Sequence, residues 1–157
     1  MKIKYESIGV VHSPFKKPEG TPIQPSRAKR AAGTVEVFEQ YVDGLCDLEG
    51  FSHIILLCHL HQTAGYRLKV VPFLDTRLRG VFATRAPSRP NPIGLSVLEL
   101  VGIDRNLLAV QGIDLLDGTP VLDLKPYVGE FDDRAGSRSG WLEDARRHTD
   151  VADDRFK

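Results

Sequence analysis

A chain of 157 residues is long enough for one domain with its own core, and its 41% hydrophobic and 27% charged residues are ordinary for a globular protein. No apolar run approaches the roughly 20 residues of a membrane-spanning helix, and the first residues do not resemble a signal peptide, so we expect a cytoplasmic protein without a membrane partner. The two cysteines, Cys46 and Cys58, lack a CxxC spacing and are expected to be reduced thiols, with a disulfide as the alternative.

The net charge is zero, but basic residues are unevenly distributed along the chain. Residues 1–30 carry seven Lys or Arg and two Asp or Glu, and residues 66–90 carry six basic residues and one acidic. Residues 31–65, between these segments, carry five acidic residues and no basic ones. If the two basic segments converge in the fold, they form an anion-binding face; the alternative is an ordinary solvated mixture of charges.

The first part of the chain predicts short strands around a long loop. Residues 2–11 and 33–38 show the apolar pattern of strands. Residues 16–30 contain three prolines and five basic residues and predict a loop. Helical spacing of apolar residues predicts a short helix over 39–49, and the apolar run 51–61 predicts a buried strand.

The second part predicts further strands and tight turns. Strands are expected over 79–84, 94–104, 107–113 and 121–124. Doubled apolar positions in the second of these suggest a bulge, and Arg105-Asn106 predicts the turn of a hairpin. The Asp-Gly-Thr-Pro sequence within 114–120 predicts another turn.

Together these elements predict a mainly β fold, an antiparallel barrel or sandwich. The tail changes to a polar composition, and Ser139 is expected to cap a short helix over 141–148. We therefore expect a β domain over 1–132 and a C-terminal extension over 133–157. No Gly-x-Gly-x-x-Gly motif follows a strand, which argues against a Rossmann fold.

The stretch 82–96, Phe-Ala-Thr-Arg-Ala-Pro-Ser-Arg-Pro-Asn-Pro-Ile-Gly-Leu-Ser, is the most informative part of the chain. Its three prolines fix φ and remove backbone donors, so it predicts a stiff loop. Arg85 and Arg89 lie in it, with no acidic residue between Asp75 and Glu99. Such a loop suits a ligand that carries a carboxylate or phosphate, although a solvated surface turn explains the same pattern.

This stretch resembles the signature of the TsaA-like family, whose members are similar to tRNA methyltransferases that use S-adenosylmethionine. Further blocks that resemble the family lie at residues 8–15, 44–53, 61–62, 114–121 and 123–127, so the resemblance covers about residues 4–132. It implies a small antiparallel β-barrel with one or two short helices that forms a homodimer. The implied substrate is the threonylcarbamoyl-modified adenosine 3′ of the anticodon, and the implied partner is the tRNA that carries it.

The resemblance also indicates the residues that bind S-adenosylmethionine. They are Gln24, Pro25, Arg27, His61, Gln62, Arg85, Arg89, Asn91, Ser96, Asp114, Asp117, Gly118, Thr119 and Pro120. Arg85 and Asp117 are the candidate catalytic residues, and Asp117 and His61 are candidates for accepting a proton or contacting the cofactor, without an assigned base. The candidates for contacting the RNA backbone are Lys16, Lys17, Lys29, Arg30, Arg67 and Lys69, the alternative for each being a solvated surface charge.

Two other kinds of function stay open at this point. One is a non-catalytic β-barrel module that binds RNA or a small anion through the same loop. The other is a metal hydrolase: His53, His59 and His61 are expected on one face of a strand, where two imidazoles at i and i+2 can ligate one ion. No third ligand has suitable spacing, so we expect no metal.

Overall fold

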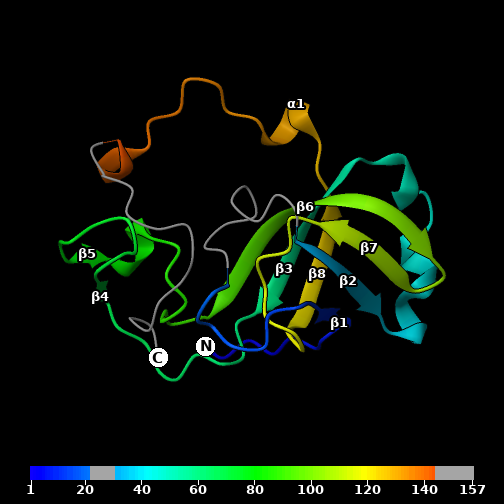
Figure 1. The fold of residues 1–157 in the computed structure, drawn as a ribbon, viewed down its shortest axis with the longest axis horizontal. Helices are drawn as coiled ribbons and strands as arrows, with labels where there is room; N and C mark the ends of the chain where they lie inside the picture. The colour runs from blue at the N-terminus through cyan, green and yellow to red at the C-terminus, as the bar shows by residue number, and fades with distance from the viewer. Residues whose placement is uncertain (22–30, 144–157) are drawn as a thin grey trace.

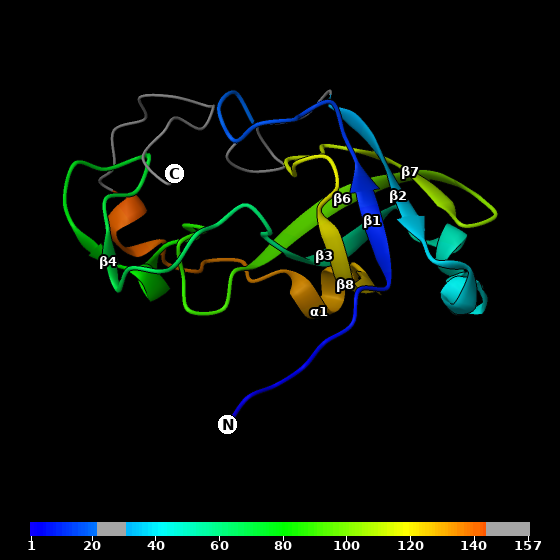
Figure 2. The same cartoon turned by 90° about the horizontal axis from the view of Figure 1, so that it is seen from below.

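The computed structural model describes residues 1–21 and 31–143, and six antiparallel strands form a closed barrel at its centre (Figures 1 and 2). The strands are β1 (Gly9–His12), β2 (Ala32–Val37), β3 (His53–His59), β6 (Ile93–Asp104), β7 (Leu107–Gln111) and β8 (Pro120–Pro126). Around the barrel they follow the order β1-β2-β7-β6-β3-β8. The predicted mainly β fold with an antiparallel barrel is therefore confirmed.

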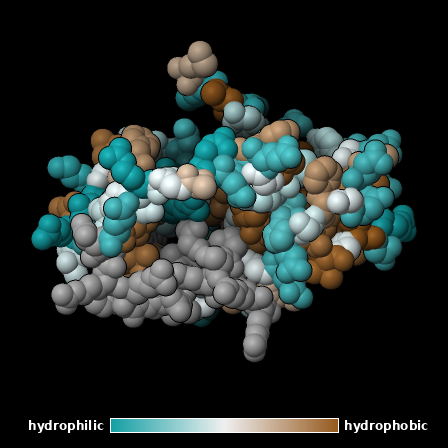
Figure 3. All heavy atoms as spheres, turned by 90° about the horizontal axis from the view of Figure 1, so that it is seen from above, coloured by the Kyte–Doolittle hydropathy of each residue, from teal (hydrophilic) through white to brown (hydrophobic). Residues whose placement is uncertain are grey.

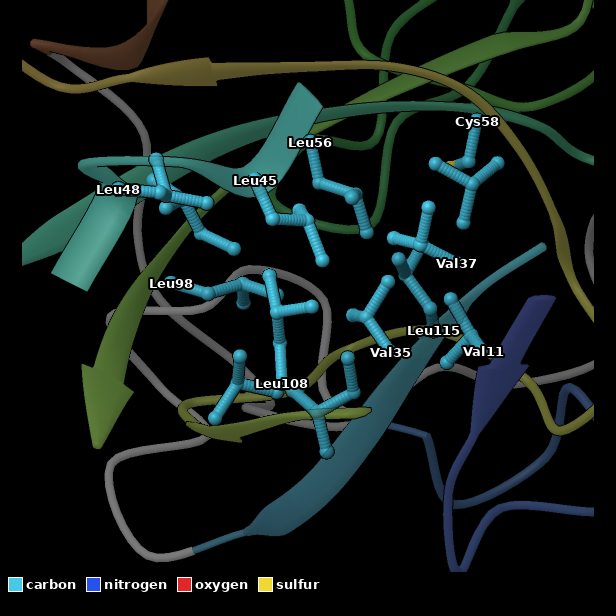
Figure 4. Close-up of a cluster of buried hydrophobic side chains, with 14 residues drawn as sticks. Val11, Val35, Val37, Leu45, Leu48, Leu56, Cys58, Leu98, Leu108 and Leu115 are labelled. Carbon is cyan, nitrogen blue, oxygen red and sulfur yellow. The ribbon is translucent and has the colours of Figure 1, made fainter. Parts of the chain in front are cut away.

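The barrel is filled by the alternate side chains of its strands (Figure 4). On β3, Ile54, Leu56 and Cys58 are completely buried, because successive side chains of a strand point to opposite faces. His53 and His59 lie on the other face of β3, as predicted, whereas the strand ends before His61. Burying these aliphatic groups stabilises the barrel at about 25 cal/mol per Å² of apolar surface.

The long strand β6 pairs with a different neighbouring strand along each half of its length. Its first half pairs with β3 and its second half with β7, and the pairing register with β7 shifts between Leu100 and Gly102. This irregularity confirms the predicted bulge, which lets one strand bend around a closed barrel. Arg105 adopts φ 54° in the turn that follows, and the Asn106 side-chain amide donates to the carbonyl of Val37 at 3.0 Å.

The strand predicted over 2–11 begins only at Gly9, so the prediction was wrong for its first residues. β1 begins at Gly9, the first residue that pairs with β2 on one edge and with β8 on the other. A Cβ at Gly9 would lie 2.2 Å from the carbonyl oxygen of Glu36, so only glycine allows this close approach of the two backbones.

Two further local predictions need correction. The helix expected over 39–49 consists of two 3₁₀ helices, η2 (Glu39–Leu45) and η3 (Leu48–Gly50), because Asp47 between them has a left-handed φ of 65°. The strand expected over 79–84 is only the two residues of β5 (Arg79–Gly80). The chain then turns into η4 (Val81–Ala83), whose end is closed by the Thr84 hydroxyl donating to the Val81 carbonyl at 2.9 Å.

A small lobe lies beside the barrel (Figure 1). There β4 (Lys69–Val70) pairs with β5, and Val70, Val81 and Ala86 form a second, separate apolar cluster. After β8 the chain forms α1 (Gly129–Asp132) and crosses to this lobe, where η5 (Gly140–Leu142) lies next to β4 and β5 (Figures 1 and 2).

The predicted helix over 141–148 is described only at its beginning, as η5; residues from 144 onward lie outside the described part of the chain. Ser139 precedes η5, but its side chain makes no capping hydrogen bond; its backbone N–H donates to the Glu143 carboxylate at 2.6 Å instead. Cys46 is exposed and Cys58 buried, and both are free thiols, so the disulfide alternative is wrong.

The molecular surface drawn in Figure 3, seen from above the view of Figure 1, is mainly polar and is interrupted by apolar patches. Within residues 1–21 and 31–143, no helix is both long enough and apolar enough to cross a bilayer.

Candidate functional site

A cavity of about 1110 Å³ lies between one end of the barrel and the small lobe. Its walls come from six parts of the chain and from Pro18 and Thr21. The parts are residues 60–63 after β3, residues 72–74, residues 82–87 and 89–91, residues 93–96 of β6, the turn residues 114–116 and 119, and residues 141–142. Small-molecule sites usually measure about 300–1,000 Å³, so the space is large enough for a nucleotide-sized ligand together with part of a second one.

One wall is the proline loop, residues 84–92. The Thr84 hydroxyl accepts from the backbone N–H of Ala86 at 3.2 Å, and the Arg89 guanidinium donates to the Thr84 carbonyl at 3.1 Å. Arg89 therefore holds the loop in shape while it lines the cavity. The sequence shows that no acidic residue lies near these arginines, but it does not show carbonyl acceptors such as those that Arg89 contacts.

Asp114 occupies the opposite wall, directly after β7. Ser96 of β6 donates its hydroxyl hydrogen bond to Oδ1 of Asp114 at 2.7 Å. Burial raises the pKa of the Asp114 carboxyl to about 7, although the Ser96 hydrogen bond and the positive charge of Arg85 act in the opposite direction. The same burial, together with the Asp114 charge, raises the pKa of the Cys58 thiol to about 12. The carboxyl group is therefore poised to gain or lose a proton near neutral pH.

Asp117 has a different environment, although it lies only three residues further along the same turn. Its Oδ1 accepts from the backbone N–H of Ser13 at 3.0 Å, and its Oδ2 forms an ion pair with Lys16 at 2.5 Å. The Lys16 hydrogen bond lowers the pKa of this carboxyl. Asp117 therefore favours its ionised form, and its contacts join the turn to the segment after β1.

The structure brings together most of the predicted cofactor-binding residues that it describes. Those that line the cavity are His61, Gln62, Arg85, Arg89, Asn91, Ser96, Asp114 and Thr119. Those of the same turn that do not line it are Asp117, Gly118 and Pro120. Gln24, Pro25 and Arg27 lie outside the described residues.

The two basic segments of the sequence both contribute to this cavity, the first through Pro18 and Thr21 and the second through the proline loop. Of the predicted RNA contacts, Lys16, Lys17, Arg67 and Lys69 are exposed, and Lys29 and Arg30 lie outside the described residues. The backbone N–H of Arg67 donates to the Ser88 carbonyl at 3.2 Å, which places this residue beside the proline loop.

Trp141 belongs to the cavity wall, although it is not among the site residues predicted from the sequence. Its indole N–H donates to the Ala83 carbonyl at 2.8 Å, and the Arg79 guanidinium lies 5.5 Å from the ring centroid. Arg79 is itself paired with Asp75 at 2.7 Å. The C-terminal extension is thereby attached to the segment that leads into the proline loop, two residues before Arg85.

The three histidines of the metal hypothesis separate in the structure: His61 lines the cavity, and His53 and His59 lie on the outer face of β3. In the described part of the chain, no three His, Cys, Asp or Glu side chains are grouped so that they would hold a metal ion. The site instead offers guanidinium, carboxyl and apolar surfaces.

These features define a β-barrel protein with a cavity of small-ligand size, and the walls of the cavity carry both charged and apolar side chains. The chain belongs to the family described as the tRNA-methyltransferase O N-terminal domain, whose family model matches residues 10–133. The resemblance to the TsaA-like family is thereby confirmed.

Relatives agree with this assignment. The chain is 54% identical over 143 residues to a probable S-adenosyl-L-methionine-binding protein of Pyrococcus abyssi. The aligned region covers 91% of this chain and 78% of the relative. It is 43% identical over 135 residues to the tRNA (adenine(37)-N6)-methyltransferase of Escherichia coli. That aligned region covers 80% of this chain and 57% of the enzyme.

Solved structures show the same fold. A crystal structure of TrmO superimposes with a TM-score of 0.78 at 45% identity, over 90% of this chain and 64% of that one. TrmO from Pseudomonas aeruginosa superimposes with a TM-score of 0.75 at 42% identity, over 89% and 62%. This chain thus spans slightly less than two thirds of these solved proteins.

Proposed function

We propose that this protein transfers a methyl group from S-adenosylmethionine to N6 of adenine 37 in a tRNA that already carries threonylcarbamoyl on that adenine. The observation that carries the proposal is the cavity itself. It gathers eight of the residues predicted to bind the methyl donor from distant parts of the chain, in a protein whose relatives include S-adenosylmethionine-binding proteins and tRNA (adenine(37)-N6)-methyltransferases.

The chemistry of the cavity fits the methyl donor, which supplies an activated methyl group on a positively charged sulfur. Arg85 and Arg89 both line the cavity, and one is suited to the donor's carboxylate and the other to the carboxylate of the substrate. Gln62 and Asn91 offer hydrogen bonds to polar groups of the donor. Leu60 and Leu115 provide apolar surface for a nucleobase. Methyl transfer leaves a neutral thioether, so the site needs to orient its ligands rather than to supply a strong acid.

The threonylcarbamoyl group adds a carboxylate to the adenine, and an arginine holds a carboxylate through two parallel hydrogen bonds. A site built around such a pair discriminates strongly against a substrate without the carboxylate, because a buried polar group is then left unpaired. Exposed Lys17, Arg67 and Lys69 are proposed to contact RNA phosphates near the cavity.

A homodimer is part of the proposal. Phe82, Ile93 and Leu95 line the cavity, yet their residues are 76%, 41% and 50% exposed. A second copy that covers these side chains would remove apolar surface from water and complete one side of the site. Light scattering coupled to size-exclusion chromatography tests this: a dimer in the wild-type protein and a monomer in Leu95→Arg are expected, and a wild-type monomer contradicts it.

The proposed activity is tested with a donor that carries a deuterium-labelled methyl group. Bulk tRNA from cells able to form threonylcarbamoyladenosine is incubated with purified protein, digested into oligonucleotides and analysed by mass spectrometry. We expect the label on adenine 37. Binding of tRNA without transfer of the label would favour a non-catalytic RNA-binding module instead.

A further inference from the structure

We infer that Asp114 is the proton acceptor of the reaction, receiving the proton that the exocyclic nitrogen of the target adenine loses when it is methylated. This inference rests on the proposed function, because it assigns a role within that reaction. It differs from the expectation that Asp117 or His61 accepts the proton.

The position of Asp114 supports the assignment. The residue lies between β7 and β8 and lines the cavity, as does Arg85 of the proline loop, whose charge acts on the Asp114 carboxyl. Ser96, from β6, donates to Oδ1 at 2.7 Å and fixes the orientation of the carboxyl plane. Ser96 is itself almost completely buried, with 2% exposure, so this support is rigid.

The reaction requires such a group. The sulfur–methyl bond breaks with its electron pair kept by sulfur, the nitrogen–methyl bond forms, and the N–H proton must leave the nitrogen. A carboxylate that accepts this proton becomes a neutral acid, and no charge is then left on the product. Burial raises the pKa of Asp114 to about 7, which matches a base that must be ionised before the reaction and hold a proton after it.

The other candidates are less suitable. Asp117 does not line the cavity, and its ion pair with Lys16 lowers its pKa, which makes it a weak base. Cys58, which faces Asp114 from β3, is held in its protonated form by a pKa of about 12. His61 also lines the cavity, and its imidazole offers a nitrogen that can accept a proton, so the experiment must separate it from Asp114.

The charged and titratable groups around Asp114 also have defined effects. The positive charge of Arg85 in the proline loop favours the ionised form of Asp114 and so acts against the effect of burial on its pKa. The Asp114 charge in turn helps to raise the pKa of the Cys58 thiol, which therefore stays protonated. The remaining neighbour, Ser96, is uncharged and does not titrate in this range.

The test compares wild-type protein with Asp114→Asn, an isosteric change that keeps an oxygen acceptor for Ser96 but removes the base. Asp123→Asn is the matched control, because Asp123 lies on β8, outside the cavity, and pairs with Lys125. Three quantities are measured: the Kd of S-adenosylmethionine, the Kd of tRNA, and the single-turnover methylation rate from pH 5 to pH 9.

We expect Asp114→Asn, at saturating concentrations of both ligands, to methylate at least about 100-fold more slowly than wild type, the usual contribution of a positioned base. The wild-type rate should rise tenfold per pH unit below about pH 7 and then level off. This rise should persist in His61→Gln, be lost in Asp114→Asn and be unchanged in Asp123→Asn.

Four outcomes overturn the inference, and the last of them overturns the proposed function as well. A rate of Asp114→Asn within about threefold of wild type means that the carboxylate accepts no proton. Loss of donor binding in this variant, with an unchanged rate at saturating donor, makes Asp114 a ligand of the donor. Disappearance of the pH dependence in His61→Gln assigns the proton to His61. Absence of any methylation by the wild-type protein refutes the proposed function itself, and the inference with it.

Discussion

Replacing Asp114 by asparagine is expected to make the protein more stable, and to do so only at neutral and alkaline pH. Burial raises the pKa of this carboxyl from 3.8 to about 7, so the folded protein binds a proton that the unfolded chain releases between these two values. The free energy of unfolding of the wild type therefore falls as pH rises from about 4 to about 7. Each pKa unit corresponds to about 1.4 kcal/mol, which gives a destabilisation of about 4 kcal/mol when the carboxyl is fully ionised.

The cavity opens to solvent, so we discount this value and expect a gain of about 2–4 kcal/mol for Asp114→Asn at pH 8, and of less than about 1 kcal/mol at pH 4. Urea unfolding of both proteins at the two pH values measures the difference, and other titrating groups cancel between them. Asp123→Asn should show no such pH-dependent gain. If Asp114→Asn is less stable than wild type to the same extent at pH 4 and pH 8, the buried charge does not have the cost that the reasoning assigns to it.

The remaining predictions concern the loop, its support and the barrel. Arg85→Ala and Arg89→Ala should each weaken donor or tRNA binding by about 1.5–3 kcal/mol. Arg89→Ala should also lower the Tm, because Arg89 donates to the Thr84 carbonyl; wild-type affinity in titration calorimetry, or an unchanged Tm of Arg89→Ala, contradicts these expectations. Trp141→Phe, which loses the indole N–H, should increase hydrogen exchange in the segment before the proline loop, and unaltered exchange contradicts the anchoring role. Gly9→Ala should lower the Tm by several degrees, while Gly44→Ala, with open space around its Cβ, should not; equal Tm values refute the close-approach argument. Chelators should leave methylation unchanged, and activity that depends on a removable metal would revive the hydrolase hypothesis.

Much of the fold was accessible from sequence because strand alternation, bulges and turns are local properties. The bulge of β6 and the hairpin at Arg105-Asn106 follow from patterns within a few residues, and both are confirmed. The errors have a distant cause in one case and a local cause in the other. Strand β1 begins where β2 and β8 flank it, and the strand predicted over 79–84 ends where the Thr84 hydroxyl closes a turn.

The sequence segments that form the site could be predicted, but the chemical role of each residue within them could not. Asp114 and Asp117 look equivalent in the sequence, since both are aspartates of one turn-forming segment. Their difference comes from groups about twenty to a hundred residues away: Ser96 beside the first, and Ser13 and Lys16 around the second. Burial and ion pairing then move the two pKa values in opposite directions. No local pattern contains that information.

Recognition of the modified adenine is tested most directly with one tRNA in two forms, one isolated from cells that add threonylcarbamoyl and one transcribed in vitro. Both are incubated with the protein and labelled S-adenosylmethionine, and the labelled nucleosides are identified by mass spectrometry. We expect the label on N6 of adenine 37 in the modified tRNA, with less than about one hundredth of that amount in the transcript, since a missing carboxylate costs the site its arginine pair. Equal labelling of the two forms would contradict carboxylate recognition, and no labelling of either would contradict the methyltransferase function of the cavity.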